Sequence, residues 1–169
     1  MKKITLLLAL CLGLGTGYAQ KVKEAEVPAA VKEAFAKNYP GLKAEWEKED
    51  GNYEAEFEGK KASINMESGK KTKTDVEGSM LISPDGKVLE TEEEIANNAL
   101  PKGVSEYVAK NFAGKKISES FKITDASNTV SYEIEIGKDE YLFDSNGGFL
   151  KKLDKKEEKD EDDDKKKKD

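Results

Sequence analysis

The sequence predicts an α+β fold of two tandem repeats, each a helix packed on an antiparallel sheet of about four strands. Two stretches, VPAAVKEAFAKNYPG (27–41) and LPKGVSEYVAKNFAG (100–114), are near-copies that begin 73 residues apart. Each has apolar residues at helical spacing, and each is followed by stretches in which apolar and charged residues alternate. Duplication of one helix-and-sheet unit is the simplest explanation of these three observations.

Both predicted helices have one apolar stripe and matching ends. Pro28 and Pro101 suit the first helical position, where a missing N–H group costs nothing. Gly41 and Gly114 suit the left-handed position that ends a helix. The apolar residues recur at steps of three and four: Val27, Val31, Ala34, Phe35 and Tyr39 in the first copy, and Leu100, Val104, Tyr107, Val108 and Phe112 in the second.

Hairpins with one apolar and one charged face are predicted after each helix. In the first copy, residues 44–48 and 53–58 alternate about a turn at Asp50 and Gly51, and Trp46 is expected in the core beneath the helix. In the second copy, Phe121 and Ile123 are expected on the apolar face, followed by a turn at 125–128. The apolar partners across that turn are Val130, Tyr132, Ile134 and Ile136, which alternate with Ser131, Glu133 and Glu135.

Each copy is predicted to close with a further hairpin, and a connector joins the copies. The first copy has strands at 61–66 and 75–83, with a longer loop between them and a turn at 84–86. The second has a strand at 140–144 and a turn at 145–148. Within the connector, 91–99, Thr91 and Glu94 have the spacing of a capping box for a short helix.

The ends of the chain differ from the part expected to fold. Residues 1–19 have a basic start, a short apolar run and small residues at the end, which predicts a signal peptide. Cys11 could instead be a lipid attachment site, although Leu10 precedes it where a small residue is expected. The predicted organisation is therefore a signal peptide at 1–19, repeats at 20–90 and 91–153, and a disordered charged tail at 154–169.

Composition excludes several classes of function. The chain has no histidine and a single cysteine, in the predicted signal peptide, so histidine-based catalysis, disulfides and zinc sites are not expected. The net charge is −6, and the lysines of the tail are balanced by acids, so the folding part is acidic and binding to nucleic acid is disfavoured. No later segment is long and apolar enough to span a membrane. We therefore expect an exported protein, in the periplasm or outside the cell, with no cofactor, no metal and no catalytic residues.

The two helical stretches, the strands of Trp46 and Phe121, and the turns SPDGKVLE and FDSNGGFLKK resemble the PepSY-like family of secreted bacterial proteins, also described as beta-lactamase-inhibitor-like. The resemblance covers about residues 22–153. It implies a tandem α+β fold, residence in the periplasm or outside the cell, and binding without catalysis. The partner that we expect is another protein, either a peptidase or an envelope protein. Peptidase inhibition or regulation has been proposed for related domains, and the inhibitor relatives present a curved sheet surface to an enzyme. The match lies in framework positions, so it transfers no contact residues.

The candidate partner-binding face consists of two carboxylate rows, which could attract a basic partner: Glu54, Glu56 and Glu58 in one copy, and Glu133 and Glu135 in the other. The alternating charge of any half-solvated strand would look the same. A hydrolase needs a buried carboxyl with a raised pKa, which exposed rows on a flat sheet would lack. Three alternatives remain: capture of a small ligand or cation, a carboxylate-dependent hydrolase with two buried carboxylates in one cleft, and a structural envelope protein.

Overall fold

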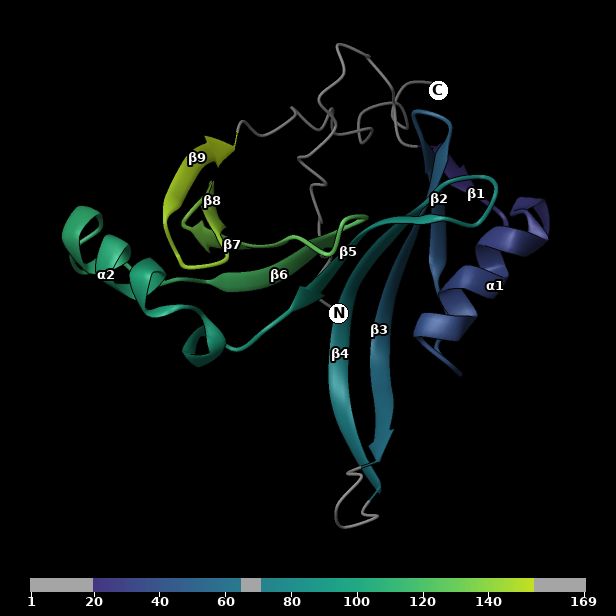
Figure 1. Ribbon diagram of the computed structural model, residues 1–169, viewed down its shortest axis with the longest axis horizontal. Helices are drawn as coiled ribbons and strands as arrows, with labels where there is room; N and C mark the ends of the chain where they lie inside the picture. The colour runs from purple at the N-terminus through teal and green to yellow at the C-terminus, as the bar shows by residue number, and fades with distance from the viewer. Residues whose placement is uncertain (1–19, 65–70, 154–169) are drawn as a thin grey trace, which may run out of the picture.

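A computed structural model describes residues 20–64 and 71–153, so the predicted signal peptide and charged tail lie outside the described residues. The described chain forms one nine-stranded antiparallel sheet, whose strands neighbour one another in chain order (Figure 1). The strands are β1 (Gln20–Val22), β2 (Glu45–Glu49), β3 (Asn52–Ile64), β4 (Lys71–Ile82), β5 (Val88–Glu94), β6 (Glu119–Asp125), β7 (Val130–Ile136), β8 (Asp139–Asp144) and β9 (Phe149–Leu153). The helices are η1 (Glu24–Glu26), α1 (Ala29–Asn38), η2 (Asn97–Ala99) and α2 (Lys102–Asn111), where η denotes a short 3-10 helix.

The predicted fold class, α+β with a separate helix-on-sheet unit in each repeat, is wrong. The structure is mostly β, because a single sheet runs through both copies and its α-helices are two segments of ten residues. The physical reason is β5, which pairs with β4 on one side and with β6 on the other. Most of β5 falls in the segment for which a connector and a capping box at Thr91 and Glu94 were predicted. The division into repeats at 20–90 and 91–153 stays a prediction.

The two α-helices end in the same way, as their near-identical sequences predict. The side-chain amides of Asn38 and Asn111 each donate a hydrogen bond to the carbonyl oxygen four residues earlier, at 2.8 and 2.9 Å. Gly41 and Gly114 follow with φ values of 82° and 79°, in the left-handed region that favours glycine. Each helix therefore stops within its copied stretch for local reasons.

The helices cover one face of the sheet, at opposite ends of it (Figure 1). Trp46 is 6% exposed and meets the ring of Phe35 edge-on at 5.7 Å, so its predicted place in the core is confirmed. The core under α1 contains Val27, Val31, Phe35, Tyr39, Trp46, Tyr53, Ala55, Phe57, Met80 and Ile82. The core under α2 contains Leu100, Val104, Val108, Ile134, Ile136, Tyr141 and Phe143.

Phe121 and Ile123 lie on the opposite face from the one predicted. In the β6–β7 register, Ser120 is the partner of Ile134, whereas Phe121 is the partner of Glu133. Because side chains alternate along a strand, Ser120 shares the α2 face and the two apolar residues do not. A one-residue difference in register moves every side chain of a strand to the other face.

The first copy also contains one strand where two were predicted. The segments 53–58 and 61–66 were expected as separate strands, but β3 runs unbroken from Asn52 to Ile64. It pairs with β4 from Tyr53, opposite Ile82, to Ile64, opposite Lys71. The continuous ladder satisfies the backbone groups that a turn would have left unpaired.

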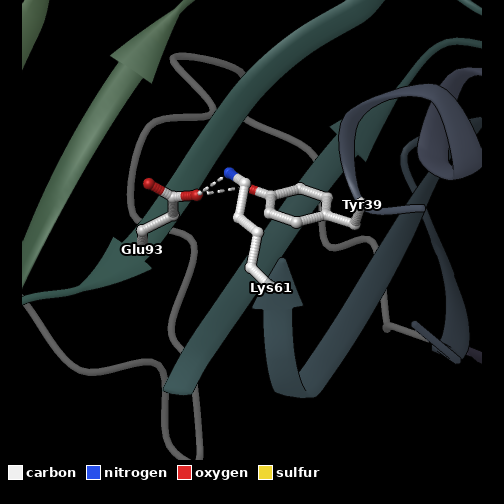
Figure 2. A network of polar contacts seen from close by, with 3 residues as sticks. All are labelled: Tyr39, Lys61 and Glu93. Carbon is white, nitrogen blue, oxygen red and sulfur yellow. Dashed lines mark hydrogen bonds and ion pairs between the residues drawn. The ribbon is translucent and has the colours of Figure 1, made fainter. Parts of the chain in front are cut away.

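A polar network fixes the end of α1 against the sheet. The Tyr39 hydroxyl donates to Glu93 Oε1 at 2.8 Å, and Lys61 Nζ donates to the same oxygen at 3.1 Å (Figure 2). Lys61 Nζ also lies 4.5 Å from the centre of the Tyr39 ring, in cation–π contact. The network joins the residue that caps α1 to β3 and β5.

Candidate partner-binding face

The five predicted site residues share the face of the sheet that neither α-helix covers. Glu54, Glu56 and Glu58 alternate along β3 with residues of the core under α1. Glu133 and Glu135 alternate along β7 with residues of the core under α2. We call this surface the helix-free face, since it lies opposite both packed helices. The continuous sheet brings the two carboxylate rows onto this one surface, with β4, β5 and β6 between them.

These carboxylates are not the evenly exposed rows on a flat sheet that the sequence predicts. Glu54 is 4% exposed and Glu133 is 5% exposed, whereas Glu56 and Glu135 are half-buried and Glu58 is exposed. The sheet is also strongly curved between its two ends (Figure 1). The buried members of each row therefore differ chemically from an ordinary half-solvated strand.

The sequence analysis missed a third carboxylate row, on β5. Glu90 and Glu92 are 6% and 2% exposed, and Glu94 lies at the exposed end of the strand. Their spacing of two along LETEEE is the same as in Glu54, Glu56 and Glu58, so the alternation was a usable signal. The prediction of a connector with a helix cap concealed it.

The rows on β3 and β5 flank β4 closely. Leu81 of β4 is the register partner of Glu54 on one side and Glu90 on the other. Ser79 is likewise the partner of Glu56 and Glu92. We call this group the carboxylate array, which consists of Glu54, Glu56, Glu58, Glu77, Glu90, Glu92 and Glu94 around Ser79 and Leu81.

Burial raises the pKa values of several carboxyl groups in the array. It raises the pKa of Glu54 to about 7, with a smaller contribution from the charges of Glu56, Glu49 and Glu47. It raises the pKa of Glu90 to about 7, with a contribution from the charge of Asp125. The protonated form of each carboxyl group is therefore favoured up to about pH 7.

Glu92 is surrounded by acidic residues from both copies. Burial raises its pKa well above the ordinary value, and the charges of Glu133, Glu90, Glu54 and Glu140 raise it further. Those neighbours come from β3, β5, β7 and β8. The two predicted carboxylate rows therefore act on a common central group, which alternation along single strands could not reveal.

Three buried polar atoms of the array have no hydrogen-bond partner among the described residues: Glu54 Oε1, Glu77 Oε1 and Ser79 Oγ. Ser79 has 0% exposure. Its hydroxyl lowers the pKa of the Glu54 carboxyl, against the larger effect of burial, but makes no hydrogen bond of normal geometry. Buried polar atoms are usually paired, so these acceptors need an explanation.

The described residues contain no group of three or more acidic, histidine or cysteine side chains placed to hold a metal ion. The loop from Asp144 to Gly148 is a turn, as predicted, because Asp144 Oδ1 accepts backbone hydrogen bonds from Asn146 and Gly148 at 2.8 and 2.9 Å. Within the described ranges, no helix has the length and apolar character required to cross a membrane.

Comparison with known proteins identifies a family and a fold. The model of the family described as beta-lactamase-inhibitor-like and PepSY-like matches residues 17–78 and 83–151, which together make up most of the chain. No curated protein matches.

Two solved structures show the same fold at low sequence identity. A protein from Bacteroides eggerthii DSM 20697, described as periplasmic, has a TM-score of 0.59 at 18% identity, over 75% of this chain and 88% of its own. A BLIP-like protein from Bacteroides fragilis NCTC 9343 has a TM-score of 0.56 at 18% identity, over 79% of this chain and 90% of its own. The likeness to these two proteins concerns the fold alone.

Proposed function

Because the chain belongs to the PepSY-like, beta-lactamase-inhibitor-like family, we propose that it is an exported, non-catalytic protein whose helix-free face binds another protein. The family match confirms the resemblance drawn from the two helical stretches. Its inhibitor-like description supports binding, and a peptidase or an envelope protein is the partner we propose. The periplasmic description of a structural neighbour supports export by the predicted signal peptide at 1–19.

The observation that carries this proposal is the continuity of the sheet. Because β5 joins the two copies, Glu54, Glu56 and Glu58 lie on the same surface as Glu133 and Glu135. A broad acidic surface attracts a basic partner and speeds the encounter. Both α-helices pack on the opposite face of this curved sheet (Figure 1).

A carboxylate-dependent hydrolase is the second candidate, because the array does contain buried carboxyl groups. Such chemistry needs neighbouring carboxyl groups whose pKa values are pushed apart, one to act as acid and one to stay ionised. In the array, the pKa values of Glu54, Glu90 and Glu92 are all raised, chiefly by the same burial. Shifts in one direction favour a binding surface over an acid–base pair.

Affinity capture from the envelope fraction of the native organism tests the proposal. The bait is the chain from residue 20 to residue 169. One variant changes Glu56, Glu58 and Glu135 to Gln, since these are the least buried of the five predicted site residues. A matched control changes Glu24, Glu26 and Glu33 to Gln, which removes the same charge from exposed positions on and beside α1.

The captured protein is then purified and its affinity for each bait is measured by titration calorimetry. We expect the face variant to bind at least tenfold more weakly and the control variant to bind as the wild type does. Equal weakening in both variants would mean that only net charge matters, and it would refute the assignment of the face. If the captured protein is a peptidase, inhibition assays with the same three baits test the inhibitory role.

A further inference from the structure

We propose that the carboxylate array recognises a Lys or Arg side chain of the partner protein, with its cationic head placed over Ser79 between the carboxylates of β3 and β5. This inference rests on the proposed function and names the chemistry of the partner. It concerns β4 and β5 as well as β3, so it extends the site beyond the residues predicted from the sequence.

The geometry of the sheet supports a site for one cationic head. Neighbouring strands lie about 4.8 Å apart, so the columns on β3 and β5 are separated by about 10 Å. Between them, Ser79 is the smallest side chain that β4 presents on this face, next to Leu81 and Glu77. Glu56 and Glu92 thus lie on either side of Ser79, and Glu54 and Glu90 lie on either side of Leu81.

The unpaired acceptors match the hydrogen-bonding groups of such a ligand. Glu54 Oε1 and Ser79 Oγ are buried acceptors that have no partner among the described residues. Their residues are 4% and 0% exposed, so bulk water satisfies neither atom well. Ammonium and guanidinium groups carry three or five donors and no acceptor. In the proposed complex the side chains that cover these atoms move apart, and one cationic head then satisfies both, whereas a neutral amide would bring an unwanted acceptor.

The charges facing the array favour a cation over a neutral ligand. Beyond the array's own carboxylates, Glu54 faces Glu47 and Glu49, Glu90 faces Asp125, and Glu92 faces Glu133 and Glu140. Lys21 acts on Glu56 from β1, and its Nζ lies 3.6 Å from Glu45, with both side chains largely exposed. The described charges therefore leave an excess of acid around Ser79, and a bound cation would shift these carboxyl groups towards their ionised form.

Apolar residues beside the array favour a long side chain over a hydrated metal ion. Across β5, the register partners of Glu92 and Glu94 are Ile123 and Phe121, which are 7% and 6% exposed. Ile123 also clusters with Leu142 and Leu153 on the same face. Lys and Arg can lay their aliphatic stems on apolar surface while the charged head meets acid.

A pair of short peptides tests the inference without knowledge of the partner. The probe is acetyl-Gly-Leu-Arg-Leu-Gly-amide, and its control replaces Arg with citrulline, which has nearly the same shape and no charge. Binding to the chain from residue 20 to residue 169 is followed by NMR shifts of backbone amides at low salt. We expect the arginine peptide to shift β4 and β5 amides and to bind at least tenfold more tightly than the citrulline peptide.

Two variants of the protein locate the site. Glu54→Gln with Glu92→Gln alters the array, and Glu133→Gln with Glu135→Gln alters the other row on the same face. We expect the array variant to lose at least tenfold in affinity for the arginine peptide and the other-row variant to lose less than threefold. Circular dichroism of each variant checks that it is folded.

Four outcomes would overturn the inference. The first is equal binding of the two peptides, and the second is an equal loss of affinity for the arginine peptide in the two variants. The third is tighter binding of spermine than of the arginine peptide. The fourth is stronger binding of the arginine peptide after Lys165, Lys166, Lys167 and Lys168 are changed to Gln. The third would indicate a free polyamine, and the fourth would indicate that the chain's own lysines occupy the array. If the array variant still binds the captured protein normally while the other-row variant does not, the proposed function stands and this inference fails.

Discussion

Replacement of Glu54 by Gln is expected to stabilise the protein at pH 8 and to leave its stability unchanged near pH 4.5. Burial raises the pKa of Glu54 to about 7 in the folded protein, whereas an unfolded chain would have the ordinary value of 4.5. Below about pH 4.5 the group is protonated in both states, so it adds no pH-dependent penalty. Between about pH 4.5 and pH 7 the unfolded state loses the proton first, so the fold loses stability as the pH rises.

The size of the effect follows from the difference between the two pKa values. Each pH unit of difference corresponds to about 1.36 kcal/mol, so Glu54 costs the folded state about 3 kcal/mol at pH 8. That is a large fraction of the 5–15 kcal/mol typical of a small domain. Gln keeps the shape of the protonated carboxyl and cannot ionise. The variant should therefore gain up to about 3 kcal/mol at pH 8 and nothing at pH 4.5.

Urea unfolding followed by Trp46 fluorescence measures this directly, because Trp46 is the only tryptophan and is buried. The curves are recorded at pH 4.5, 6 and 8 for the wild type, Glu54→Gln and the exposed control Glu58→Gln. We expect the two Gln variants to diverge only above about pH 5. If Glu54→Gln follows the same pH dependence as the wild type, the carboxyl is ionised at ordinary pH in the fold and the burial argument is wrong.

Two further predictions concern the structure away from the array. Tyr39→Phe should lower the free energy of unfolding in urea by about 1.5–2 kcal/mol, because it removes a part-buried hydrogen bond to the Glu93 carboxylate. The control Tyr141→Phe removes a longer hydrogen bond to Asp139, of 3.3 Å, and should lower it by less than about 0.5 kcal/mol. Equal losses in the two variants would contradict the role of the network. Gly78→Ala should lower the free energy of unfolding by at least about 3 kcal/mol or prevent folding, because the new Cβ would lie 2.0 Å from the Glu92 carbonyl oxygen. The control Gly114→Ala has open space around the new Cβ and a φ of 79°, and should lower it by about 1 kcal/mol. Similar losses in the two variants would mean that β4 and β5 separate easily.

The parts of the fold that could be predicted are set by local chemistry. The helix stops at Gly41 and Gly114 depend on backbone freedom within each copied stretch. The turn at Asp50 and Gly51 was also predictable, since its φ values of 48° and 85° suit a tight hairpin turn. Trp46 could be placed in the core because its neighbours alternate cleanly. In each case the deciding interactions lie within a few residues of the chain.

The parts that could not be predicted depend on pairing between distant residues. Val88–Glu94 is a strand because β4 and β6 both pair with it, although its four glutamates have weak strand propensity. The face of Phe121 was set by register with β7, since a bulky apolar residue suits either side locally. Burial of Glu54 and Glu92 depends on a curved sheet that single-strand patterns do not describe. The alternation of the glutamates could therefore be seen in the sequence, whereas their burial and their position on one shared face could not.

The stability and binding experiments together distinguish a site from an accident of packing. If the array only fills space, replacing Glu54 and Glu92 by Gln should stabilise the free protein and leave partner binding unchanged. If the array receives a cationic side chain, the same change should stabilise the free protein at pH 8 and weaken binding, because ionisation that is costly in the free state is compensated in the complex. Functional sites often contain features that lower the stability of the free protein, such as buried acidic side chains, because binding requires them. A purely structural role would not explain why replacing Glu54 and Glu92 raises the free energy of unfolding and at the same time weakens binding to the partner.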